Sequence, residues 1–146
     1  MSDLPALAPP YNPEAEPFWS AAGEGRLVLP VCDACGHHIW YPRSWCPVCG
    51  SDAVTWTVMR GRGAVYACTV LRKAMGPWAV AAPYVGAYVE LVEGPRILTN
   101  IVTDDPTAVH VGQSVMATFE PVREPTEGSP ATHLLRFRPT SAPPDG

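Results

Sequence analysis

Two short motifs, Cys32-Asp-Ala-Cys35-Gly36 and Cys46-Pro-Val-Cys49-Gly50, decide how the rest of this chain is interpreted. Within each motif a tight turn lets both cysteine thiolates point at one ion, and the two pairs together supply four ligands. A glycine follows the second cysteine of each pair, where the backbone of such a turn needs conformational freedom. The pattern predicts a tetrahedral metal site, which we interpret as structural zinc.

Alternatives to zinc stay open at this point. Disulfide bonds are less favoured, because no signal peptide is evident and Cys68 lies in an apolar, strand-like run. His37 or His38 could replace a thiolate, but four cysteines already complete the coordination sphere, so we expect both to be loop residues. Iron binds the same four thiolates in rubredoxin-type sites, so the sequence does not distinguish iron from zinc. A closed sphere leaves no position for water, and the ion is expected to hold the fold rather than catalyse.

The composition indicates a β-rich chain of ordinary domain size. Of 146 residues, 47% are apolar and only 16% are charged, and the 18 prolines and 12 glycines argue against long helices. The chain has no run of 18 apolar residues, and its N-terminus lacks the basic and hydrophobic regions of a signal peptide. We therefore expect a cytoplasmic protein without membrane association.

The charge distribution is more informative than the net charge of −4, which already disfavours general nucleic-acid binding. Residues 53–89 contain no Asp or Glu. The basic residues in the same stretch are Arg60, Arg62, Arg72 and Lys73. This stretch is a local positive region in an acidic chain, and it is the predicted place to bind a phosphate group.

Four segments are expected along the chain. They are an N-terminal arm and helix over residues 1–30, a zinc ribbon over 31–53, an OB-fold over 54–139 and a disordered tail over 140–146. Residues 1–12 are rich in proline, and we expect a loose arm there. Pro17 is favoured as the first residue of a short helix that ends at Gly23 or Gly25.

Strand-forming patterns dominate after the cysteine motifs. A short strand is predicted at residues 54–58, and five main strands are predicted at 64–71, 84–91, 96–102, 114–122 and 134–138. A long first strand followed by a hairpin is typical of a small Greek-key barrel such as an OB-fold. Periodicity alone leaves a β-sandwich nearly as favoured.

A set of motifs spread over residues 16–122 resembles the DUF35 family. The motifs are Pro17-Phe18-Trp19, Gly25-x-Leu27, Cys32-x-x-Cys35-Gly36, Tyr41-Pro42-Arg43, Cys46-Pro47-x-Cys49-Gly50-Ser51, Trp56, Gly61-x-Gly63, Val65-Tyr66, Thr69-Val70, Pro83-Tyr84 and Val89-Glu90-Leu91. The resemblance implies an N-terminal helical segment and a rubredoxin-like zinc ribbon, joined to a C-terminal OB-fold.

The resemblance also implies a role in acyl-CoA metabolism. Members of this family accompany thiolase-like proteins, and in bacterial steroid side-chain degradation a DUF35 domain and a thiolase-fold partner form a retro-aldolase. There the DUF35 component is a scaffold that helps to bind CoA, and the partner carries the chemistry. We therefore expect a non-catalytic subunit of an aldolase heterotetramer that binds an acyl-CoA thioester. Some members are fused to a hydratase domain, so this chain is expected to be a stand-alone subunit or an excised domain.

Two groups of residues are candidates for these contacts. Arg60, Arg62, Arg72 and Lys73 are expected to meet CoA phosphates, and Trp78 in the apolar loop 74–83 is expected to line an acyl path or to contact the partner. The aromatic and proline residues of the ribbon either pack it onto its neighbour or bind the partner, and they are Trp40, Tyr41, Pro42 and Trp45.

Two other functions remain open from the sequence. Zinc ribbons and OB-folds also bind single-stranded nucleic acid, and Tyr66, Tyr84 and Tyr88 are the residues that would stack on bases. The excess of acidic residues makes this the less favoured reading, so we expect no nucleic-acid partner. A purely structural interaction protein with no ligand of its own is the third hypothesis.

Overall fold

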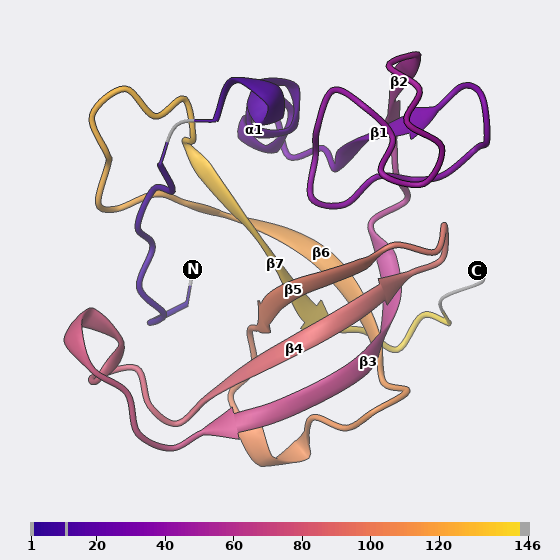
Figure 1. Cartoon of the computed structure of the whole chain (residues 1–146). Helices are drawn as coiled ribbons and strands as arrows, with labels where there is room; N and C mark the ends of the chain where they lie inside the picture. The colour runs from indigo at the N-terminus through magenta and orange to yellow at the C-terminus, as the bar shows by residue number, and fades with distance from the viewer. Residues whose placement is uncertain (1, 11, 144–146) are drawn as a thin grey trace.

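In the part of the chain that the structure describes, one α-helix, three short 3-10 helices, a two-stranded sheet and a five-stranded barrel are present (Figure 1). The computed structural model describes residues 2–10 and 12–143. In chain order the elements are η1 (Pro13–Ala15), α1 (Glu16–Gly23), β1 (Val28–Cys32), β2 (Val54–Val58), β3 (Arg62–Leu71), η2 (Gly76–Trp78), β4 (Tyr84–Leu91), β5 (Arg96–Ile101), η3 (Pro106–Ala108), β6 (Ser114–Pro121) and β7 (His133–Pro139). Among the described residues, no helix has the length and apolar character needed to cross a membrane.

The barrel confirms the five predicted main strands and selects an OB-fold over a sandwich. Its strand order is β3-β4-β5-β7-β6, closed on itself. Neighbouring strands are antiparallel except for β5 and β7, which run parallel and share the single pair Ile101↔Phe137. The alternating inward residues of the strands form the core, and Val65, Val89 and Phe137 are almost fully buried.

The helix begins one residue before the predicted position. Asn12 accepts a hydrogen bond from the backbone N–H of Glu14 and caps η1, which leads directly into α1 at Glu16. Pro17 therefore stands second in α1, where its missing N–H costs no helical bond. The helix ends at Gly23 as predicted, and its apolar side, including Phe18 and Trp19, is buried in the same core as the barrel.

Strand β2, at the start of the predicted OB-fold segment 54–139, lies outside the closed barrel. Strand β2 pairs antiparallel with β1, from Val28↔Val58 to Cys32↔Val54, and belongs to the ribbon sheet. The backbone N–H of Met59 still donates to the carbonyl of Leu27, so the chain leaves the ribbon only after residue 59. Alternation identifies a strand but not its partner, and this is why the sequence pattern predicted the strand at 54–58 without assigning it to the ribbon sheet.

The N-terminal arm is packed rather than loose. Leu4, Ala6 and Ala8 are buried, and the carbonyl of Ala6 accepts hydrogen bonds from the backbone of residues 123 and 124. Figure 1 shows the arm running beside the loop between β6 and β7. The proline content suggested a flexible segment, but the alternation of apolar residues at 4, 6 and 8 gives the arm one buried side.

The predicted disordered tail is described only in part. The N–H of Thr140 donates to the carbonyl of Ser114 at 3.0 Å, so the barrel pairing continues just past β7. Residues 144–146 lie outside the described residues.

Replacing Gly63 by alanine is expected to destabilise the barrel by about 1–3 kcal/mol, because a Cβ there has no room. The added atom would lie 2.5 Å from the carbonyl oxygen of Glu90, which is fixed by the β3–β4 pairing. Gly86→Ala is the matched control, since the nearest atom to its Cβ would be the flexible end of Leu71 at 3.1 Å, and no backbone atom is close. Thermal unfolding of both variants measures the difference, and equal melting temperatures would contradict this account.

Candidate metal centre and surrounding surfaces

Two tight turns of nearly identical geometry, one in each Cys-x-x-Cys-Gly motif, form the candidate metal centre. We call each of these turns a knuckle. In the first, the N–H of Gly36 donates to the carbonyl of Cys32 at 2.8 Å, and in the second the N–H of Gly50 donates to that of Cys46 at 2.9 Å. Both glycines have positive φ angles, 76° and 78°, as the sequence pattern requires. Each knuckle therefore curls its two cysteines toward the same point.

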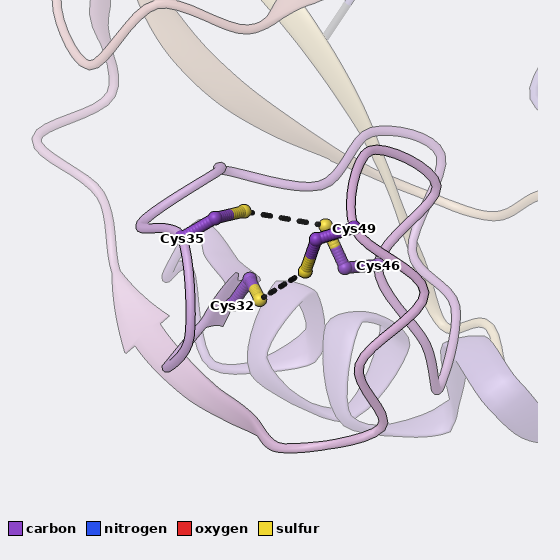
Figure 2. A group of neighbouring side chains, drawn as sticks. All are labelled: Cys32, Cys35, Cys46 and Cys49. Carbon is purple, nitrogen blue, oxygen red and sulfur yellow. Dashed lines mark hydrogen bonds between the residues drawn. The ribbon is translucent and has the colours of Figure 1, made fainter.

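The four cysteine sulfurs lie close together and face a common centre (Figure 2). The Sγ atoms of Cys32 and Cys49 are 3.5 Å apart, those of Cys35 and Cys46 are 3.6 Å apart, and all four lie within 4.8 Å of one another. A tetrahedral zinc site with Zn–S bonds of about 2.3 Å requires sulfurs separated by roughly 3.8 Å. The donor set and spacing fit a tetrahedral metal ion held by these four residues.

The surroundings of Cys32 and Cys35 shift the pKa values of these two thiols in opposite directions. The backbone N–H of Cys35 hydrogen-bonds the Cys32 sulfur and, with help from Ala34, lowers the pKa of Cys32 to about 7. For Cys35 the N–H of His37 acts in the lowering direction, but burial and the neighbouring thiols outweigh it and raise the pKa to about 12. Metal binding requires the thiolate form of all four cysteines and therefore releases their protons.

The histidines beside the first knuckle take structural roles. The carbonyl of His37 accepts the N–H of Cys32 at 2.9 Å, and His38 forms an isolated bridge with Val31. Neither belongs to the group of metal-ligating side chains found among residues 2–10 and 12–143. This placement agrees with the expectation that both are loop residues.

Most of the ribbon aromatics pack inward. Trp40 makes edge-to-face contacts with Phe18 and Tyr41, at centroid distances of 5.6 and 5.2 Å, and Pro42 is buried. Trp45 is different, because it is 46% exposed and has the Arg43 guanidinium 5.7 Å from its ring centre. Of the four ribbon residues predicted to pack or bind, Trp40 and Tyr41 pack against the core shared by α1 and the barrel, Pro42 is buried, and Trp45 is exposed.

The four predicted phosphate-binding cations fall into two separate pairs. Arg60 and Arg62 stand where the chain enters β3, and Arg72 and Lys73 follow the end of the same strand. Strand β3 lies between the two pairs. Because a strand rises about 3.3 Å per residue, its ten residues separate the pairs by roughly 30 Å. The backbone N–H of Arg60 donates to the Glu93 carboxylate at 2.9 Å, which places a negative charge beside the first pair.

Trp78 borders a hollow that Trp19 of α1 and Leu98 of β5 also line. Its ring lies 4.8 Å from that of Tyr84, and the Arg136 guanidinium lies 5.9 Å from its centre. Arg72, Lys73 and Trp78 all lie in the loop between β3 and β4, within a short stretch of sequence.

The sequence prediction missed the most deeply buried charges of the barrel. Glu120 on β6 and Arg136 on β7 are 2% and 4% exposed in their side chains, with Nε and Oε2 3.3 Å apart. Ser2 donates to both carboxylate oxygens of Glu120, at 3.0 and 2.8 Å. Charged residues at inward positions of otherwise apolar strands could have indicated that these two side chains are buried. No sequence pattern identifies which residues they pair with.

The fold and the four-cysteine centre define a class of protein, a zinc ribbon joined to an OB-fold. Family models agree with that class along the chain: residues 19–55 match the ChsH2 rubredoxin-like zinc ribbon domain, and residues 56–120 match the ChsH2 C-terminal OB-fold domain. The boundary between the two models falls inside β2, the strand whose pairing assigns it to the ribbon.

Curated relatives and solved structures narrow the class to one family. DUF35 domain-containing scaffold proteins of Methanothermobacter thermautotrophicus and Methanocaldococcus jannaschii are 31% and 33% identical, over 78% and 83% of this chain and 86% and 87% of theirs. The chain belongs to the DUF35 family. A probable enoyl-CoA hydratase alpha subunit of Thermomonospora curvata is 37% identical over 84% of this chain, but the match spans only 36% of that longer protein.

Two solved structures share the fold. A chain of the Ltp2-ChsH2(DUF35) aldolase superposes with a TM-score of 0.73 at 34% identity, covering 90% of this chain and 98% of that one. A DUF35 protein of unknown function from Sulfolobus solfataricus has a TM-score of 0.61 at 17% identity over 88% of this chain and 87% of its own, and it shows the fold alone.

Proposed function

We propose that this chain is a non-catalytic accessory subunit that binds an acyl-CoA thioester and supports a thiolase-like partner. The complex would be an aldolase that cleaves a carbon–carbon bond in the side chain of a steroid or lipid acyl-CoA. The observation that carries the proposal is the match, at 34% identity and over 98% of its length, to a chain of the Ltp2-ChsH2(DUF35) aldolase.

The metal centre supports a structural role for this subunit. Four thiolates complete a tetrahedral sphere, which leaves no coordination position for a substrate or an activated water. We propose that the ion is zinc, bound by Cys32, Cys35, Cys46 and Cys49. Its contribution is to hold the ribbon against α1, and the chemistry belongs to the partner.

We propose that the CoA phosphates bind at Arg72 and Lys73 rather than at Arg60 and Arg62. Arg72 and Lys73 are exposed neighbours in the loop that also carries Trp78, and residues 53–89 contain no acidic residue. The Glu93 carboxylate beside Arg60 disfavours a phosphate at the other pair. Trp78 is then close enough along the chain to contact the pantetheine arm.

The double variant Arg72→Ala/Lys73→Ala is expected to weaken binding of a CoA thioester by the assembled complex by roughly tenfold or more, since it removes charge-assisted contacts to phosphate. Arg60→Ala/Arg62→Ala is the matched control and is expected to change affinity less. Calorimetry with acetyl-CoA measures both. Equal affinities for the wild type and Arg72→Ala/Lys73→Ala would refute the assignment.

The exposed ribbon surface is the proposed contact with the partner. Trp45 and Val48 are 46% and 67% exposed and lie on and beside the second knuckle. A symmetric dimer of the partner would recruit two copies of this chain and form a heterotetramer. We place such a complex in the cytoplasm.

Nucleic-acid binding is not favoured by the positions of the tyrosines. The Arg96 guanidinium covers the ring of Tyr66 at 3.8 Å, and Tyr84 lies against Trp78. These two rings already have stacking partners, so they do not form the open platform that single-stranded binding requires.

A further inference from the structure

Strand β2 leaves one side of the ribbon sheet unpaired. The sheet has two strands, and β2 pairs with β1 along one of its sides. Among the residues that the structure describes, no strand and no isolated bridge pairs with its other side. A two-stranded sheet is only marginally stable by itself, and an unpaired strand edge is a ready template for another strand. We call this open side of the strand the β2 edge.

The hydrogen bonds between β1 and β2 show which backbone groups lie on the β2 edge. The N–H of Met59 donates to the carbonyl of Leu27 at 2.8 Å, just beyond the last pair of the two strands. Alternate residues of an antiparallel strand bond to the same neighbour, so the N–H and C=O groups of Thr57 and Thr55 also point to β1. The residues between them point their N–H and C=O groups away from β1, and these residues are Val54, Trp56 and Val58.

The β2 edge lacks the features that usually keep a strand edge from pairing. Natural edges are protected by lysine, by proline or by a bulge. Residues 54–58 contain no charged residue and no proline, and the register with β1 runs without a shift from one end of β2 to the other. Thr55 and Thr57 are exposed, and Val58 is 58% exposed. Nothing in the strand itself therefore opposes the addition of a further strand.

The sequence of β2 is complementary to itself. It reads Val54-Thr55-Trp56-Thr57-Val58, which is the same in both directions. Antiparallel pairing of two copies about the central tryptophan therefore places valine opposite valine and threonine opposite threonine, and threonine pairs of this kind stabilise sheets.

The charges that flank β2 follow the same symmetry with opposite signs. Asp52 lies four residues before Trp56 and Arg60 lies four residues after it, and both charged residues are exposed. In the pairing about Trp56, Asp52 of each copy would face Arg60 of the other. The ends of the paired strands are therefore complementary in charge as well.

We propose that the β2 edge binds the β2 edge of a second copy of this chain, antiparallel and with Trp56 opposite Trp56 of the second copy. The product is an isologous dimer with one continuous sheet in the order β1-β2-β2-β1. The contact is small, so we expect a dissociation constant on the order of 10–100 µM. The contact includes neither Trp45 nor the loop that carries Arg72, Lys73 and Trp78, so the inference does not depend on the proposed CoA site or on the thiolase-like partner.

Sedimentation equilibrium of the full chain with its metal bound measures the association, over about 5–500 µM to bracket the expected constant. Hydrogen exchange followed by nuclear magnetic resonance locates the contact. The amides of Thr57 and Met59 bond to β1 and are expected to be protected at every concentration. The amides of Trp56 and Val58 are expected to exchange at least threefold more slowly in the concentrated than in the dilute chain, because only the dimer gives them acceptors.

Two double variants at the same exposed threonines test the register. In Thr55→Lys/Thr57→Lys every new lysine would face a lysine of the second copy, and dimerisation is expected to weaken roughly tenfold or more. Thr55→Lys/Thr57→Glu places opposite charges there instead and is expected to keep the dissociation constant within about threefold of the wild type. Thr69→Lys changes an exposed threonine on β3 and is expected to leave dimerisation unchanged. Circular dichroism confirms that each variant is folded.

Three results would overturn the proposal. A chain that stays monomeric at the highest concentration has no such contact. A dimer in which the Trp56 and Val58 amides exchange as fast as in the monomer would have its contact elsewhere. Equal dissociation constants for the two double variants would reject the antiparallel register about Trp56, because the two differ only in the charge at residue 57.

Discussion

Replacing Cys46 by serine is expected to abolish stoichiometric metal binding and to unfold the ribbon. Cys46 is fully buried and its sulfur lies 3.6 Å from that of Cys35. The buried cluster around the centre is small, comprising Cys32, Ile39 and Cys46 with Val54 packed against it. A cluster of this size cannot hold the loops by itself, and structural zinc contributes about 10–16 kcal/mol in zinc-finger peptides.

Metal analysis and nuclear magnetic resonance measure this effect together. The wild-type chain is expected to contain one zinc, and Cys46→Ser close to none, with loss of dispersed signals from residues 28–58. The signals of the barrel core around Phe137 are expected to persist, because most residues of the core that the barrel shares with α1 and β1 come from the barrel strands. Iron instead of zinc in the wild-type protein would correct the metal assignment but leave the four ligands unchanged.

Cys68→Ser is the control for this experiment. Cys68 lies on β3, half-buried, with its sulfur 3.9 Å from the carbonyl of Val109 and outside the four-sulfur group. Its replacement is expected to leave the metal content at one. A Cys46→Ser protein that still binds one metal with an unchanged ribbon would contradict the account of the centre.

Replacing Glu120 by glutamine is expected to destabilise the chain by about 3–5 kcal/mol, because Arg136 is then left as an uncompensated buried cation. For a chain of this size such a loss lowers the melting temperature by roughly 10 °C or more. Glutamine keeps the shape of the side chain, so the effect measures charge rather than packing. The same change also weakens the hydrogen bonds that hold Ser2 to this carboxylate.

An exposed ion pair supplies the matched control. Glu90 and Arg96 pair at 2.8 Å across β4 and β5, but their side chains are 44% and 51% exposed. Glu90→Gln is therefore expected to cost at most about 1 kcal/mol. Thermal unfolding of both variants gives the comparison, and similar losses at the buried and exposed pairs would show that burial does not set the energy of the Glu120–Arg136 pair.

The local patterns of the sequence predicted the metal centre and the barrel strands well. Each cysteine pair is a local motif, and the glycine that follows it adopts the left-handed conformation that the motif requires. The five main strands could be predicted because alternation is also local. Both features depend on residues that are close together in the chain.

The features that sequence reasoning missed depend on partners far apart in the chain. Strand β2 pairs with β1 across the whole ribbon, and the arm packs on residues more than one hundred positions away. The apolar alternation of Leu4, Ala6 and Ala8 was present but short, and the prolines around it indicated a loose segment. Arg136 and Glu120 sit on neighbouring strands whose register no local pattern specifies.

Reconstitution with a thiolase-like partner tests the central claim most directly. The two proteins are co-expressed, co-purified and assayed for retro-aldol cleavage of a steroid acyl-CoA, and each is also assayed alone. The account predicts a stable complex in which cleavage requires the partner's chemistry and is greatly increased by this chain, with no cleavage by this chain alone. Cleavage by this chain alone, or the absence of any complex with the partner, would contradict it.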